Sequence, residues 1–148
     1  MKTRILWSLL ASTTVVLGLA ACNKAEAPSE VSSDVADAQA NRQQDISAAR
    51  ADQNETQAQT AGDAVSPDPD DRGDAIKQRA SAQYDTAIAA AEGDRKVAKE
   101  GCEALQGDAQ AQCKKSADAA YDAAKSNAQL ARDSEKDRGD AVQKLDNK

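Results

Sequence analysis

The residues of this 148-residue chain best equipped for chemistry are cysteines, and two of them, Cys102 and Cys113, frame a short polar segment. On one unbroken helix, residues at this spacing would lie about 16 Å apart, whereas a disulfide needs a Cα separation of about 5.5 Å. A bend at Gly107 would place the thiols opposite each other on antiparallel helices, so we predict a disulfide. Reduced or intermolecularly bridged thiols are the alternative. A redox-active pair is disfavoured, because the Cys-X-X-Cys spacing is absent.

The third cysteine, Cys22, follows a segment organised for export. A short basic start precedes an uncharged stretch, residues 5–19, and about 15 residues suit a signal-peptide core but are too few to span a bilayer. The sequence Leu19-Ala20-Ala21-Cys22 resembles the lipobox of bacterial lipoproteins. The resemblance implies removal of residues 1–21 as a signal peptide and a lipid on Cys22 that anchors the chain to a membrane. An ordinary secretory signal cut at the preceding alanines, or an uncleaved anchor, is the alternative.

Lipidation of Cys22 would also explain the odd number of cysteines. Three cysteines in an exported chain leave one unpaired, whereas a lipid on Cys22 leaves Cys102 and Cys113 as an even pair in an oxidising compartment. Lipoproteins held at the inner membrane typically carry Asp after the lipidated residue, and this chain carries Asn23. We therefore expect it in the outer membrane, facing the periplasm.

Charge and composition disfavour several functions. Removing residues 1–21 takes away two basic residues and no acid, which changes the net charge from −6 to −8. Nucleic acid is a disfavoured partner, because its recognition needs a basic patch and stacking aromatics. The sequence has no His, no nucleophile–base pair, no phosphate loop and no calcium loop, so we expect no catalysis, no metal and no cofactor. The Arg-Gly-Asp tripeptides at 72–74 and 138–140 are interpreted as solvated charges.

Large apolar residues are too scarce for a conventional core. From residue 22 onward, 127 residues include 13 Val, Ile, Leu and Tyr against 30 Ala. Burial of so few large side chains cannot offset the cost of ordering a compact globule, so elongated helices or partial disorder remain. We predict an all-α fold with a flexible tether over residues 22–33, a marginal helix and a Pro/Asp linker over 34–70, and a helical hairpin over 71–148.

The hairpin prediction rests on two runs of small residues at heptad spacing. The first run holds Ala80, Tyr84, Ala87, Ala91, Asp94, Ala98, Gly101 and Leu105, and the second holds Ala109, Cys113, Ala117, Ala120, Ala124 and Ala131. Such a seam allows close helix approach but buries little area. Residues 71–76 match 137–142, and 82–85 resemble 119–122, which indicates two related helical units. A break at Gly93 competes with the one at Gly107.

The cysteine segment, from Arg95 to Tyr121, resembles small Ala-rich proteins of proteobacterial envelopes. The shared pattern is Ala-X₃-Cys-X₂-Leu-X-Gly-X-Ala-X₃-Cys-X₃-Ala-X₂-Ala-aromatic. This resemblance implies a disulfide hairpin and no particular activity. The C-terminal Lys148 is similar to the lysine that joins murein-type lipoproteins to peptidoglycan. Because the chain lacks their aliphatic heptads and basic-aromatic terminus, attachment through Lys148 is a secondary hypothesis.

Together these patterns predict an envelope lipoprotein that spaces or scaffolds, with no enzymatic activity. The expected partners are the membrane, through the lipid on Cys22, and an envelope protein or peptidoglycan. A hydrophilin-like stress protectant is one alternative, because the composition is polar and Ala-rich with a weak 11-residue repeat. An inhibitor or immunity-type binding protein is the other.

Overall fold

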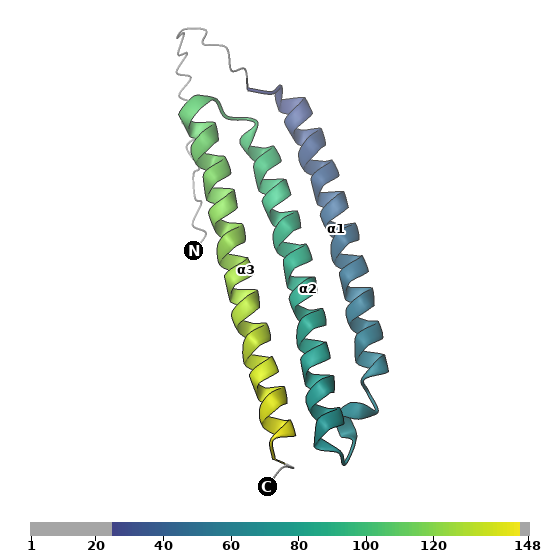
Figure 1. Cartoon of the computed structure of the whole chain (residues 1–148). Helices are drawn as coiled ribbons and strands as arrows, with labels where there is room; N and C mark the ends of the chain where they lie inside the picture. Colours follow the sequence, from purple (N-terminus) through teal and green to yellow (C-terminus); the bar gives the residue numbers. More distant parts are fainter. Residues whose placement is uncertain (1–24, 146–148) are drawn as a thin grey trace, which may run out of the picture.

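Three long helices lie side by side in the computed structural model, which describes residues 25–145 (Figure 1). They are α1 (Pro28–Gln59), α2 (Pro69–Cys102) and α3 (Gly107–Gln143), and a short 3-10 helix, η1 (Asp63–Val65), lies between the first two. The part of the chain that the structure describes contains no strand. The predicted all-α fold, with elongated helices and a disulfide-closed hairpin, is confirmed.

The helices form an open layer rather than a closed bundle. α2 lies in the middle and packs against both neighbours, whereas α1 and α3 do not touch each other within residues 25–145 (Figure 1). The two broad faces of α2 therefore stay uncovered. Buried apolar side chains are correspondingly few: Val31, Ala38, Ile46, Ala75, Ala80, Ala91, Cys102 and Ala117.

α1 is longer and better packed than the sequence predicts. It begins at Pro28, whereas the predicted tether extends to residue 33, so residues 28–33 are helical instead. Proline at the first helical position has a preset φ and no N–H to satisfy, and the Glu30 carboxylate accepts a hydrogen bond from the Ala27 N–H at 3.2 Å. The segment predicted to be a marginal helix is a helix of 32 residues that packs along α2.

Polar contacts hold α1 against α2 where large apolar residues are missing. The Thr86 hydroxyl of α2 lies 3.2 Å from the Ala49 carbonyl oxygen of α1. Arg42 of α1 forms an ion pair with Asp94 at 2.6 Å. At the end of α1, Thr60 is almost fully buried, and its hydroxyl and carbonyl oxygens accept hydrogen bonds from Arg79 at 2.7 and 3.0 Å. The hydrogen bonds to Thr60 satisfy polar groups that burial would otherwise penalise, whereas the buried Arg42 Nε has the ion pair with Asp94 without hydrogen-bond geometry.

α2 begins inside the predicted Pro/Asp linker, with a capped first turn. Asp68 is the N-cap, and its carboxylate accepts a hydrogen bond from the Asp70 N–H at 2.9 Å. Pro69 occupies the first helical position. The carboxylate satisfies one of the free N–H groups at the helix start, which is the usual role of an Asp cap.

The chain reverses direction between α2 and α3 where the sequence predicts. α2 runs through Gly93 without a break and ends at Cys102, and α3 begins at Gly107. Gly107 has a φ of +55°, a conformation that glycine adopts without the steric cost of a Cβ. The competing break at Gly93 is therefore wrong. There a Cβ would lie 2.4 Å from Arg42 Cγ, so glycine is needed for the close approach of α1.

Candidate functional site

The disulfide joins the last turn of α2 to the first turns of α3. Cys102 and Cys113 are bonded, with their Cα atoms 5.7 Å apart, as the spacing argument predicts. Cys102 is fully buried. The bond closes the hairpin across the bend, and it defines one end of the layer, which we call the disulfide end.

The beginning of the described chain is attached to the disulfide end. The backbone N–H of Glu26 donates a hydrogen bond to the carbonyl oxygen of Glu103, in the bend, at 3.2 Å. The Glu103 carboxylate in turn pairs with Lys114 at 2.5 Å and accepts a hydrogen bond from Gln110 at 2.6 Å. Desolvation and then repulsion by the Glu103 carboxylate raise the pKa of Glu26 above its usual value. Residue 26 thus lies beside the bend rather than on a free tether.

The two remaining predicted site residues, Cys22 and Lys148, lie outside the described residues. Their predicted roles in lipidation and in peptidoglycan attachment therefore remain predictions. The structure does fix the ends of the body nearest to them. Glu26 lies at the disulfide end, and Leu145 follows α3 at the opposite end of the layer (Figure 1).

The two Arg-Gly-Asp tripeptides meet each other across α2 and α3. A Cβ built on Gly73 would lie 2.8 Å from the Gly139 carbonyl oxygen, and a Cβ on Gly139 would lie 2.8 Å from the Gly73 carbonyl oxygen. Both glycines are buried. The aspartates next to these glycines also form ion pairs, because the Lys77 ammonium contacts Asp74 and Asp140, each at 3.2 Å. The two tripeptides therefore pack against each other through their glycines. The interpretation as solvated charges does not account for this buried glycine contact.

Ion pairs and ring contacts connect the middle of α2 to α3. Asp118 of α3 contacts Arg95 at 2.5 Å and Lys99 at 2.7 Å, and the hydrogen bond from Lys99 is the main reason that the pKa of Asp118 is lowered. The Arg95 guanidinium also lies 5.2 Å from the Tyr121 ring centroid. In a second contact of this type the helices exchange roles. The Arg132 guanidinium, from α3, lies 4.6 Å from the centroid of the Tyr84 ring of α2.

Sequence analysis did not identify these arginine–tyrosine contacts, although the sequence contains a signal for them. Tyr84 and Arg95 are 11 residues apart in α2, and Tyr121 and Arg132 are 11 residues apart in α3. An offset of 37 residues converts the first pair into the second. In antiparallel helices, equal spacing on both partners allows each arginine to meet the other helix's tyrosine. The two helical units inferred from the repeat are thus related by an approximate twofold axis.

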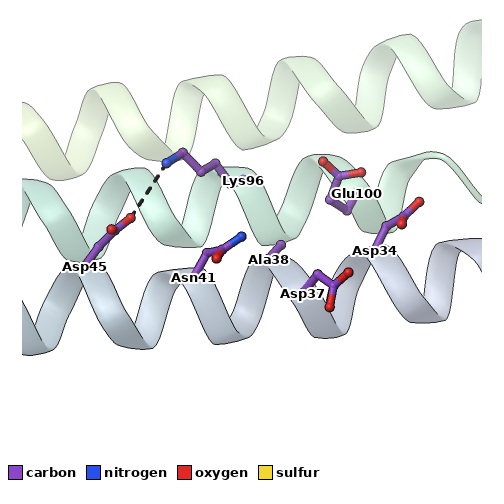
Figure 2. A pocket seen from close by; sticks show the side chains of 7 residues that line it. All are labelled: Asp34, Asp37, Ala38, Asn41, Asp45, Lys96 and Glu100. Carbon is purple, nitrogen blue, oxygen red and sulfur yellow. Dashed lines mark ion pairs between the residues drawn. The ribbon is translucent and has the colours of Figure 1, made fainter.

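An acidic hollow lies between α1 and α2 near the disulfide end (Figure 2). It is lined by Asp34, Asp37, Ala38, Asn41 and Asp45 from α1 and by Lys96 and Glu100 from α2. Lys96 reaches Asp45 at 3.7 Å, an ion pair drawn as a dashed line in Figure 2. Within residues 25–145, no three acidic, Cys or His side chains come together closely enough to hold a metal ion. The hollow is a polar surface depression.

Comparison with known proteins adds no assignment. No protein-family model, curated protein or solved structure matches this chain. Among the helices described here, none is both long enough and apolar enough to cross a membrane. The fold and site define an all-α, disulfide-closed helical layer.

Proposed function

We propose that the chain is a lipid-anchored envelope protein whose helical layer acts as a spacer or scaffold, without catalysis. The observation that carries this proposal is the position of Glu26, which is hydrogen-bonded to the bend at the disulfide end. It lies only four positions after Cys22, the predicted lipidation site. At no more than about 3.5 Å per residue, this link spans at most about 14 Å. A lipid on Cys22 would therefore hold the disulfide end close to the membrane surface.

The length of the helices gives the proposed spacer its reach. α3 contains 37 residues, which at about 1.5 Å per residue corresponds to about 55 Å. The disulfide end would lie near the lipid headgroups, and the opposite end, with η1 and Leu145, would extend away from them (Figure 1). Several acyl chains give a stable anchor where a single chain is marginal, so a lipidated cysteine suits a permanently attached spacer.

Packing supports a permanent scaffold over a stress protectant that folds only on drying. All three helices are joined by ion pairs and hydrogen bonds, and the disulfide closes the bend. Far-UV circular dichroism in dilute buffer separates the two functions. We expect strong helical minima without any dehydrating agent, whereas a protectant would be largely non-helical under these conditions.

The anchor is tested by replacing the lipidated residue. Cys22→Ala should accumulate as unprocessed precursor that incorporates no labelled fatty acid, because the acceptor thiol is gone. A double Cys102→Ala/Cys113→Ala variant is the matched control, since it loses thiols but keeps the lipobox. Density fractionation should place the unaltered chain with outer membranes. Maturation of Cys22→Ala to an acylated form would disprove the proposed anchor.

Attachment to peptidoglycan through Lys148 is tested separately. Digestion of isolated peptidoglycan should release the chain bound to muropeptides if the hypothesis holds, and Lys148→Ala should abolish the conjugate. Retention of the anchored but unconjugated chain would leave the spacer proposal intact and remove this partner.

A further inference from the structure

The helices form an open layer, so both broad faces of α2 are uncovered. On one of these faces, a hollow lies on each side of α2. A hollow between α1 and α2 and another between α2 and α3 are both lined by Gln83 and Ala87. These two residues place both hollows on the same broad face of the layer. We call it the alanine face.

The hollow between α2 and α3 has an equivalent second hollow further along the same two helices. The first is lined by Ala80, Gln83, Tyr84, Ala87, Ala128, Ala131, Arg132, Ser134 and Glu135. The second is lined by Ala91, Asp94, Arg95, Ala98, Ala117, Ala120, Tyr121 and Ala124. The 37-residue offset that exchanges the two arginine–tyrosine contacts also converts every position of the second hollow into a position of the first. For antiparallel helices, such an axis runs perpendicular to their plane, so both hollows open on one side, in line along the α2–α3 contact; we call the two hollows together the groove.

Much of this groove is exposed and has no partner within the described chain. Ala87 and Ala98 of α2 are exposed, as are Ala120, Ala124 and Ala131 of α3. These residues belong to the two predicted heptad runs. The α2–α3 contact uses Ala80, Ala91 and Ala117, which are buried, and leaves the other alanines facing solvent. More than half of the residues in each predicted run are therefore exposed in a single chain.

The opposite face of the layer is acidic. Its α1–α2 side carries Asp34, Asp37, Asp45 and Glu100 around the hollow of Figure 2, and further along the same helices Asp52 and Asp85 line another hollow. The whole chain has a net charge of −6, so two copies meeting through these carboxylates would repel each other. On the alanine face, Asp94 and Glu135 are balanced by Arg95 and Arg132 in the same hollows, so a second copy can approach this face at a lower electrostatic cost.

We propose that the alanine face of α2 and α3 binds the same face of a second copy, which gives a four-helix core with α1 of each chain at its edges. The available area is sufficient. α2 is about 50 Å long at its 34 residues, and two helices are about 20 Å wide, so the face offers about 1,000 Å² per chain. A standard stable interface needs about 800 Å² per partner. This proposal does not depend on the lipid anchor.

Symmetry favours a second copy over an unrelated partner. A twofold dimer requires each surface to be complementary to itself. The groove already repeats under its internal twofold axis, with Arg95 on Tyr121 at one end and Arg132 on Tyr84 at the other. A copy facing it therefore meets alanine with alanine along the centre in either direction. Close packing of small residues is the geometry that four-helix cores with short interhelical distances use.

Sedimentation equilibrium of the mature full-length chain, in density-matched detergent, tests the proposal. We expect twice the mass of one chain. Ala124→Glu, and its 37-residue counterpart Ala87→Glu, should raise the dissociation constant of the dimer at least about tenfold, because each places an unpaired carboxylate in an apolar interface. Ala111→Glu is the control, since Ala111 is also exposed in α3 but lies outside both hollows, about 140° around the helix from Ala124. It should leave the dimer unchanged.

Circular dichroism of each variant confirms that its helices are retained, since all three positions are exposed. A single-chain mass for the unaltered protein up to about 100 µM would overturn the proposal, because a weaker association is not a stable dimer. Equal weakening by Ala111→Glu and Ala124→Glu would overturn it as well. Purification with a different protein in fixed ratio, lost in Ala124→Glu, would show that the groove takes another partner.

Discussion

Reduction of the Cys102–Cys113 disulfide should destabilise the helical layer by an amount that loop length sets. The bond joins residues separated by 11 positions. In the chain-entropy relation, opening a loop of this size restores unfolded-state entropy worth about 3 kcal/mol at 25 °C. Apolar packing adds little at the bend, because its one large aliphatic residue, Leu105, is 40% exposed, and the contacts that Glu103 makes there with Lys114 and Gln110 are polar. We therefore expect nearly the full effect on stability.

The size of the expected shift in melting temperature follows from the helical residues. The three helices contain 32, 34 and 37 residues. An unfolding entropy of about 2.1 cal/mol/K per residue gives about 0.2 kcal/mol/K for the helical part. A loss of about 3 kcal/mol then lowers the melting temperature by about 14 °C. Helix content at 25 °C should change little, because the Ala-rich helices keep their intrahelical hydrogen bonds.

Thermal unfolding followed by far-UV circular dichroism, with and without reductant, measures this shift. The double variant Cys102→Ala/Cys113→Ala is the control, since it should melt near the reduced protein and show no response to reductant. A shift below about 3 °C would refute the reasoning, because the loop-entropy contribution would then be nearly absent. Collapse of helix content on reduction at 25 °C would show instead that the helices depend on the disulfide.

Three further predictions concern contacts between the helices. Gly139→Ala should lower the free energy of unfolding, because its Cβ would lie 2.8 Å from the carbonyl oxygen of Gly73. The Cβ of Gly101→Ala meets nothing within 4 Å, so this variant should be neutral or stabilise the fold by up to about 1 kcal/mol. Urea unfolding of both variants checks this, and the same sign for both would contradict it. Thr86→Val keeps the shape but removes the hydroxyl, which lies within hydrogen-bond distance of the Ala49 carbonyl oxygen and Gln53 Oε1 of α1; this should cost about 1 kcal/mol in the same assay, and an unchanged midpoint would contradict that. Lys99 and Arg95 lower the pKa of Asp118 from its ordinary 3.8, so its stabilising contribution is present above pH 3.8 and is lost as the pH falls through the lowered value. Asp118→Asn should therefore be less stable than the unaltered chain at pH 7, with the difference shrinking in acid, and a pH-independent difference would disprove this origin.

The disulfide and the bend could be predicted from sequence because both follow from local geometry. Two cysteines 11 positions apart cannot bond on one helix, and Gly107 lies between them. No packing information is needed for that conclusion. The all-α fold follows equally well, since Ala-rich sequence with few large apolar residues favours helices and disfavours a conventional core.

The packing of α1 could not be predicted, because its contacts are polar and distant in sequence. Only Val31, Ala38 and Ile46 are buried along its 32 residues, which is too sparse a pattern to indicate a face. The contact from Arg42 to Asp94 explains why a carboxylate interrupts the alanine run of α2. In the sequence alone, Asp94 is a flaw in the heptad seam.

The alanine runs themselves predict pairing but not which alanines pair. Ala80 and Ala91 are buried against α3, whereas Ala87 and Ala98 in the same run are exposed. A larger side chain would reveal its preferred neighbour through its volume, but an alanine fits almost any close helix contact. The roles of Cys22 and Lys148 stay predictions, because these residues lie outside the described chain.

The two ends of the α2–α3 pair fix the register of the helices along their axes, which the alanine seam alone would leave undetermined. If α3 slid along α2 by one turn or one heptad, most alanines would meet other alanines, and packing energy would change little. Slippage of this kind is the usual weakness of repetitive seams, which need specific residues to fix one register. Here Gly73 and Gly139 fit together only when they are level, and the Cys102–Cys113 bond fixes the other end. The α2–α3 pair is thus fixed at both ends, so its length and the stagger of its two helices stay constant.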